Sequence, residues 1–202
     1  MNKLSLEKTE KIREESKQSE YTNVIMLGHC CIKNFPIEIL QLNTIQNLKR
    51  LDLSHNYIIE IPSSISVLVN LKELWLSNNP IEIFPKNIEY LTKLELIDIN
   101  NTKIKTLPTE IALLEHLYEV DWRNTPLSAF LFETYEIIEN DIFQLRTIFQ
   151  QLHKRKVLET ELFEYLYGEH FIMDADRPGI KEDIKLLVQV ILNLLDITHT
   201  KI

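Results

Sequence analysis

Apolar residues recur at a fixed spacing between Leu51 and Leu117. Three successive stretches place apolar residues, and one proline, at the same positions, and they start at Leu51, Leu74 and Ile97, which are 23 residues apart. A period of this length predicts a solenoid, because each unit can bury its apolar face only against its neighbours. At the start of each stretch, two apolar residues flank one that points the other way, which predicts a short strand. After the proline, apolar residues three positions apart predict a helical or 3₁₀ segment.

The same pattern extends outward with departures. An earlier repeat starts at Ile25, which is 26 residues before Leu51, so we expect about three extra residues around positions 43–45. A last strand is expected at residues 120–122. Residues 23–127 are therefore predicted to form about five repeats whose parallel strands line one concave face.

The pattern L-x-L-x-x-N-x-I-x-x-I-P-x-x-I-x-x-L-x-x-L resembles a leucine-rich repeat, and the apolar-Pro step with its 23-residue period resembles the intracellular, Ras-suppressor-like type. The resemblance covers about residues 23–127 and implies that protein partners bind on the concave face. The expected fold class is α/β, a short leucine-rich repeat solenoid with a curved parallel sheet, an N-terminal cap and an α-helical C-terminal unit.

One polar position of the repeat refines this expectation. The turn after each strand carries an amide, a hydroxyl or a thiol that can bond unpaired backbone groups. Those turn residues are Cys30, Asn56, Asn79, Thr102 and Thr125. Only two of the five are Asn, so we expect the outer repeats to hold their turns less firmly.

The flanking segments follow other patterns. Residues 1–22 are polar and are expected to be either a capping helix, at about residues 7–17, or a disordered tail. Residues 128–202 are expected to form a helical C-terminal unit that either has its own core or packs on the open end of the last repeat.

Within that C-terminal unit, Ser128 is expected to cap a helix over residues 129–139, and Asp141 a longer one. The spacing of apolar residues over positions 142–168 predicts either one kinked helix or two helices. Pro178 is expected to open a last helix whose wide apolar face implies burial, or else a dimer contact.

Composition excludes several classes of function. The chain has 45% apolar and 26% charged residues, which is typical of a folded protein. Its three glycines cannot form a phosphate-binding glycine-rich loop. The net charge of −8 makes nucleic acid and anionic membranes poor partners.

Compartment is inferred from cysteines and hydropathy. Cys30 and Cys31 are adjacent, a spacing that rarely forms a disulfide, and the cysteine clusters that close secreted repeats of this kind are absent. The N-terminal residues have no apolar signal core, and no apolar run reaches ~18 residues. We therefore expect no membrane insertion and a cytoplasmic or other reducing compartment.

A parallel register predicts which side chains share the concave face. One column contains Trp75, flanked by Asp52 and Asp98, and an exposed Trp beside carboxylates is a candidate hot spot for Lys or Arg. The competing interpretation is that Trp75 packs against Leu96 and Arg50 as local cover. Trp122 stands at an inward position and is expected in the core. The candidate protein-binding residues are Trp75, Asp98, Asp121, Asp52, Arg50, Glu73 and Arg123.

Catalytic chemistry is not expected on this surface. Asp98 and Asp121 should be neighbours whose repulsion raises one pKa, but no nucleophile–base pair accompanies them. A metal site drawn from His29, His55 and Asp52 would lie on an open surface that does not fix its geometry. We therefore expect no catalytic residue, no metal and no cofactor.

The sequence predicts a non-catalytic protein–protein interaction module, an adaptor or assembly subunit, whose partner has a basic or mixed surface. One alternative is that the C-terminal helices are the main binding or dimerisation surface and the repeats are a scaffold. A second alternative is an enzyme with a concave carboxylate site. Nucleic acid is not an expected partner, since the basic run at residues 153–156 is too short.

Overall fold

The fold was analysed in a computed structural model. The structure describes residues 10–11, 14–15, 17, 22–41, 45–135, 141–167, 185–186 and 188–189. Contacts between Cα atoms divide the chain into two compact units, residues 1–149 and 150–202, and each unit is described by itself.

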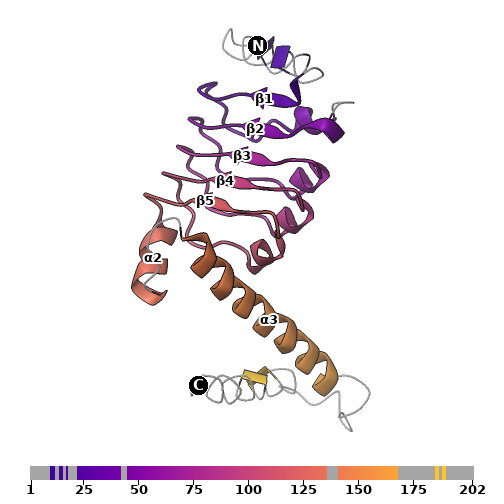
Figure 1. The fold of residues 1–202 in the computed structure, drawn as a ribbon, viewed down its shortest axis with the longest axis vertical. Coiled ribbons are helices and arrows are strands. Elements are labelled where there is room, and N and C mark those ends of the chain that lie inside the picture. Colours follow the sequence, from indigo (N-terminus) through magenta and orange to yellow (C-terminus); the bar gives the residue numbers. More distant parts are fainter. Residues whose placement is uncertain are drawn as a thin grey trace. The chain divides into compact units, whose positions relative to one another are not determined.

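The first unit contains a five-stranded parallel sheet whose strand order follows the chain (Figure 1). The strands are β1 (Val24–Met26), β2 (Arg50–Asp52), β3 (Glu73–Trp75), β4 (Leu96–Asp98) and β5 (Glu119–Asp121). Each strand is three residues long, and its central residue is buried. The pairing confirms the predicted register, since the third residues of β2 to β5 lie side by side.

Short 3₁₀ helices lie on the other side of the coils. They are η1 (Ile37–Gln41), η2 (Ile45–Asn47), η3 (Ser63–Val67), η4 (Lys86–Tyr90) and η5 (Thr109–Leu113). Pro62, Pro85 and Pro108 precede the last three helices in extended backbone conformation, as the apolar-Pro step predicts. Each of these helices buries one central isoleucine in the continuous core.

Asparagine side chains connect consecutive repeats at the turns. The Asn56 Oδ1 accepts hydrogen bonds from the N–H groups of Cys30 and Ile32, at 3.0 and 2.9 Å. Its Nδ2 donates to the carbonyl oxygens of Leu27, Leu53 and Ser54. Asn56 therefore bonds both its own turn and the repeat before it.

The threonines at the same position form fewer hydrogen bonds than Asn56 does. The Oγ1 of Thr102 donates to the Ile99 carbonyl of its own turn at 2.8 Å, and Thr125 does the same to Trp122 at 2.5 Å. Neither makes a hydrogen bond to the preceding repeat within the described residues. This difference supports the expectation that the outer turns are held less firmly.

Both ends of the sheet have additional contacts. Residues 10, 11, 14, 15 and 17 are helical, and the Glu15 carboxylate accepts a 3.0 Å hydrogen bond from the Met26 N–H of β1. Edge N–H groups are templates for unwanted strand pairing, so this bond occupies one that would otherwise be exposed.

At the other end, α2 (Pro126–Tyr135) starts three residues before the predicted helix at 129–139. Ser128 is not its cap. Thr125 is, because its Oγ1 accepts a 3.1 Å hydrogen bond from the Ser128 N–H, and Pro126 suits the first helical position. Sequence reasoning had assigned Thr125 only to the preceding turn, but its hydroxyl serves both.

The next helix, α3 (Ile142–Tyr167), is one continuous element, which resolves the choice between one helix and two. Asp141 caps it as predicted, since its Oδ1 accepts from the Gln144 N–H at 3.0 Å. Leu145 and Phe149 of its first turns join the core of the repeats. Arg146 donates to the carbonyl oxygens of Leu114, Glu115 and Leu117, which follow η5.

In the second unit, the Gln189 amide donates to the Glu159 carboxylate at 2.8 Å. Residues 185, 186, 188 and 189 are helical, with Leu186 exposed and Val188 buried. The rest of the predicted helix after Pro178 lies outside the described residues.

Candidate protein-binding surface

Strand pairing brings four predicted site residues into one row across the concave face. Asp52 pairs with Trp75, Trp75 with Asp98, and Asp98 with Asp121. Arg50 and Glu73 are paired in the same way two residues earlier. Arg123 follows β5 and completes the set that the sequence indicated.

Trp75 is only half-buried, because Arg50 covers one face of its ring. The Arg50 guanidinium lies 5.1 Å from the ring centroid, which is a cation–π distance. The same guanidinium contacts the Glu73 carboxylate at 2.8 Å, and that carboxylate accepts from the Trp75 indole N–H at 3.1 Å. Trp75 is thus less exposed than the sequence predicted, and Arg50 packs on it as the competing interpretation expected.

The aspartates of this row share one local geometry. The Asp52 Oδ1 accepts from the N–H and hydroxyl of Ser54, at 2.9 and 2.7 Å. The Asp98 Oδ1 accepts from the Asn100 N–H at 3.0 Å. Each carboxylate therefore bonds the backbone two residues later, where the strand ends, as Asx turns do.

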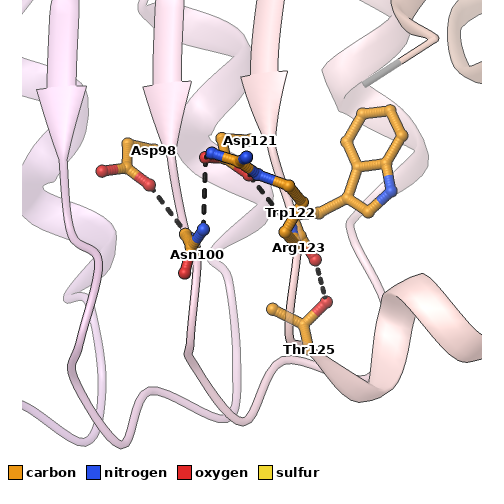
Figure 2. Close-up of polar contacts among 6 residues, drawn as sticks. All are labelled: Asp98, Asn100, Asp121, Trp122, Arg123 and Thr125. Atoms are coloured by element: carbon orange, nitrogen blue, oxygen red, sulfur yellow. Dashed lines mark hydrogen bonds and ion pairs between the residues drawn. The ribbon is translucent and has the colours of Figure 1, made fainter. Parts of the chain in front are cut away.

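Asp121 is at the centre of a wider hydrogen-bond cluster (Figure 2). Its carboxylate accepts from the Arg123 N–H, Nε and Nη2 at 3.1, 2.9 and 2.7 Å. The Asn100 amide donates to the same carboxylate at 3.3 Å. Because Asn100 also bonds Asp98 through its backbone, it connects the two carboxylates.

The pKa values of Asp98 and Asp121 are shifted in opposite directions. Burial raises the pKa of Asp98 above its usual 3.8, against hydrogen bonds from Ser77 and Asn100 that lower it. The charge of Asp121 also raises this pKa, but it is a smaller cause than burial. The sequence therefore predicted the direction correctly and named a secondary cause. Burial also acts to raise the pKa of Asp121, but hydrogen bonds from Arg123 and Asn100, with the Arg123 charge, lower it overall.

Acidic groups outnumber basic ones on this face. Within the described strands and the turns that follow them, the concave positions carry five carboxylates and two guanidinium groups. These are Asp52, Glu73, Asp98, Glu119 and Asp121 against Arg50 and Arg123. The face therefore favours a partner with an excess of positive charge.

Trp122 is fully buried, which confirms its assignment to the core. Figure 2 shows its ring pointing away from the polar cluster of Asp98, Asn100 and Asp121.

Sequence reasoning did not anticipate the conformation of the next column. His29, His55, Asn78, Asn101 and Asn124 all have φ between 54° and 58°. The His29 and His55 rings stack at 4.0 Å, and the Asn101 amide donates to the Asn78 Oδ1 at 2.6 Å. The signal was the recurrence of Asn, which tolerates this left-handed conformation better than most residues.

The described residues also bear on metal binding and membrane insertion. In the part of the chain that the structure describes, no group of three or more His, Cys, Asp or Glu side chains could hold a metal ion. Among the described helices, none combines the length and apolar character that crossing a membrane requires.

Comparison with known proteins identifies the class of fold. Residues 46–89 match the family model of leucine-rich repeats in two copies. The chain therefore contains leucine-rich repeats, and its fold is an α/β leucine-rich repeat solenoid with a helical C-terminal part. No curated protein matches the chain.

Several solved structures are similar over about half of the chain. A leucine-rich repeat protein of Leptospira interrogans is 34% identical over 49% of this chain and 30% of its own, with a TM-score of 0.44. An internalin of Listeria monocytogenes is 25% identical, over 46% of this chain and 25% of the internalin chain, with a TM-score of 0.40.

A third match is the leucine-rich repeat ectodomain of a plant membrane receptor kinase from Arabidopsis thaliana, which was solved in complex with CASPARIAN STRIP INTEGRITY FACTOR 2. It is 29% identical over 46% of this chain and 11% of its own, with a TM-score of 0.41. The chain thus spans less than a third of each of these three structures.

Proposed function

We propose that this protein is a non-catalytic adaptor or assembly subunit that binds a protein partner on the concave face of its repeats. Leucine-rich repeats are generally protein–protein interaction modules, and curved solenoids present extended concave surfaces to partners. The observation that carries the proposal is the row formed by Asp52, Trp75, Asp98 and Asp121 across four adjacent strands.

The row combines the two features that interface hot spots need. Trp75 offers a large amphipathic ring whose orientation is already held by Arg50 and Glu73, so little side-chain entropy is lost on binding. Asp52 of the row, and Glu119 two residues before Asp121 on β5, have no salt-bridge partner among the described residues, so a basic partner can pair with them.

The same features indicate the character of the partner. Arg50 already occupies one face of the Trp75 ring, so a partner reaches the indole from its remaining exposed side. A basic or mixed protein surface fits the acidic excess. The adjacent cysteines Cys30 and Cys31 support a cytoplasmic or other reducing compartment for this interaction.

The test is capture of partners from a lysate of the cells that make the protein, with bound proteins identified by mass spectrometry. The concave variant combines Trp75→Ala with Glu119→Lys, since both side chains are at least partly exposed. Asp98→Lys is a poorer choice, because Asp98 is only 9% exposed and a buried lysine would disturb the turn.

The matched control combines Tyr90→Ala with Glu89→Lys on η4, away from the sheet. It removes one aromatic ring and reverses one charge, as the concave variant does. We expect the concave variant to lose a specific partner by a factor of at least ~30, which corresponds to about 2 kcal/mol for a hot-spot Trp. Equal loss with both variants would refute concave recognition.

The second candidate is that the C-terminal helices form the main binding or dimerisation surface. It is favoured by Leu186, which is 68% exposed on a helical segment next to the buried Val188. Light scattering of the wild type and a Leu186→Glu variant tests it. A dimer that becomes a monomer only in the variant would support this second candidate.

A further inference from the structure

A hollow of about 590 Å³ lies between the first two repeats, at the start of their convex side. Its volume is within the range of small-molecule pockets, so it can admit a long side chain together with water. Phe35, Ile37, Ile59 and Pro62 supply its apolar lining. This hollow shares no residue with the concave row.

The backbone explains where the hollow opens. The Tyr57 N–H donates to the Ile32 carbonyl at 2.7 Å and holds the first two repeats together just before it. Further along, Glu60 forms a parallel bridge with Ile83 of the third repeat. Within the described residues no such bridge joins Glu60 to the first repeat, so space remains on that side.

Two isoleucines of the hollow are exposed where the solenoid does not require apolar residues. Ile37 is 54% exposed and Ile59 is 59% exposed. The repeat positions equivalent to Ile37 hold Ser63, Lys86 and Thr109, and those equivalent to Ile59 hold Lys33, Glu82 and Lys105. Exposed apolar side chains that cluster against the pattern of a fold mark interaction sites.

The charged lining of the hollow is predominantly acidic. It contains the carboxylates of Glu38 and Glu60 and one ammonium group, that of Lys33. None of these three side chains has a salt-bridge partner among the described residues. A ligand that completes this site therefore needs an apolar stem and a positive end.

We propose that this hollow binds a lysine side chain of a protein partner. Four methylene groups of lysine cover Ile37 and Ile59, as lysine stems commonly cover apolar surface while the charged head stays hydrated. The ammonium group pairs with the carboxylates of Glu38 and Glu60. The site provides a contact outside the concave face and sets a preference for partners that present a lysine there.

The test titrates the full chain with short peptides and follows backbone amide signals by NMR. The probes are acetyl-glycyl-lysyl-glycinamide, the same peptide with norleucine, which keeps the stem but lacks the ammonium group, and the same peptide with acetyl-lysine. With the lysine peptide we expect saturable shifts confined to the amides of residues 33–35, 37–38 and 59–61. The norleucine and acetyl-lysine peptides should bind at least threefold more weakly.

A Glu38→Gln, Glu60→Gln double variant should reduce the affinity for the lysine peptide to that for the norleucine peptide. Glu82→Gln is the matched control, because Glu82 is exposed one repeat further and does not line the hollow. Equal binding of the lysine and norleucine peptides, or shifts located elsewhere, would overturn the proposal. The titration is independent of Trp75, so a Trp75→Ala variant should give the same result whether or not the concave proposal holds.

Discussion

Replacing Asn56 by Thr should destabilise the repeats far more than its small change in volume suggests. The chain itself uses Thr at this position in later repeats, so the substitution is compatible with the turn. A threonine hydroxyl can retain the hydrogen bond to the Leu53 carbonyl of its own turn. It cannot reach the preceding repeat in the way that the Asn56 amide does.

The magnitude follows from the groups left without a partner. The N–H of Ile32 and the carbonyl of Leu27 belong to residues that are 1% and 0% exposed, so water cannot readily replace the amide. Each buried unpaired group costs about 1–3 kcal/mol, whereas Cys30 and Ser54 are half-buried and can bond water. The expected loss in unfolding free energy is about 3 kcal/mol, a large part of a typical ~5–15 kcal/mol.

Urea denaturation measures this loss, with Thr102→Ala as the control. That variant leaves one buried group, the Ile99 carbonyl, without its donor, whereas Asn56→Thr leaves two, so we expect about half the loss, ~1.5 kcal/mol. Hydrogen exchange should also show faster exchange of the Ile32 amide in the Asn56 variant. If Asn56→Thr destabilises the protein no more than Thr102→Ala does, the cross-repeat bonds are not what stabilises the first turn.

The remaining predictions concern the outer turn, the last coil and the concave carboxylates. Thr102→Asn should raise the unfolding free energy by about 1 kcal/mol, because the new amide can bond the preceding repeat as Asn79 does; no gain in urea melts would contradict this. Arg146→Met should lower the unfolding free energy by about 1–3 kcal/mol in urea melts, since the three carbonyl groups after η5 lose a charged donor. The pKa of Asp98 is raised by folding, so its ionisation destabilises the fold as pH rises above 3.8, and Asp98→Asn should be more favourable at pH 7 than at pH 3. The pKa of Asp121 is lowered by folding, so its ionised carboxylate stabilises the fold above pH 3.8, and this stabilisation is lost as pH falls. Asp121→Asn should therefore lower the stability more at pH 7 than at pH 3. Thermal melts of both variants at pH 3 and pH 7 check the two opposite pH dependences.

The register of the sheet could be predicted from the sequence because its period is fixed. Once Leu51, Leu74 and Ile97 are aligned, a parallel sheet leaves one choice for the neighbours of Trp75. The burial of Trp122 followed from the same alignment.

Features that depend on side-chain conformation could not be predicted from the pattern. Arg50 can extend toward solvent or fold over Trp75, and sequence spacing does not distinguish these conformations. The raised pKa of Asp98 depends mainly on its burial, which the column position alone does not reveal. The start of α2 was misplaced because Thr125 ends a repeat and caps a helix at once.

The most direct test of concave recognition is hydroxyl-radical footprinting of the complex with a captured partner. Met26 and Trp75 report on the concave face, while Tyr90 of η4 is an exposed aromatic reference away from the sheet. We predict that the partner reduces labelling of Met26 and Trp75 and leaves that of Tyr90 unchanged. Unchanged labelling of Trp75 together with protection of Tyr90 would contradict binding on the concave face.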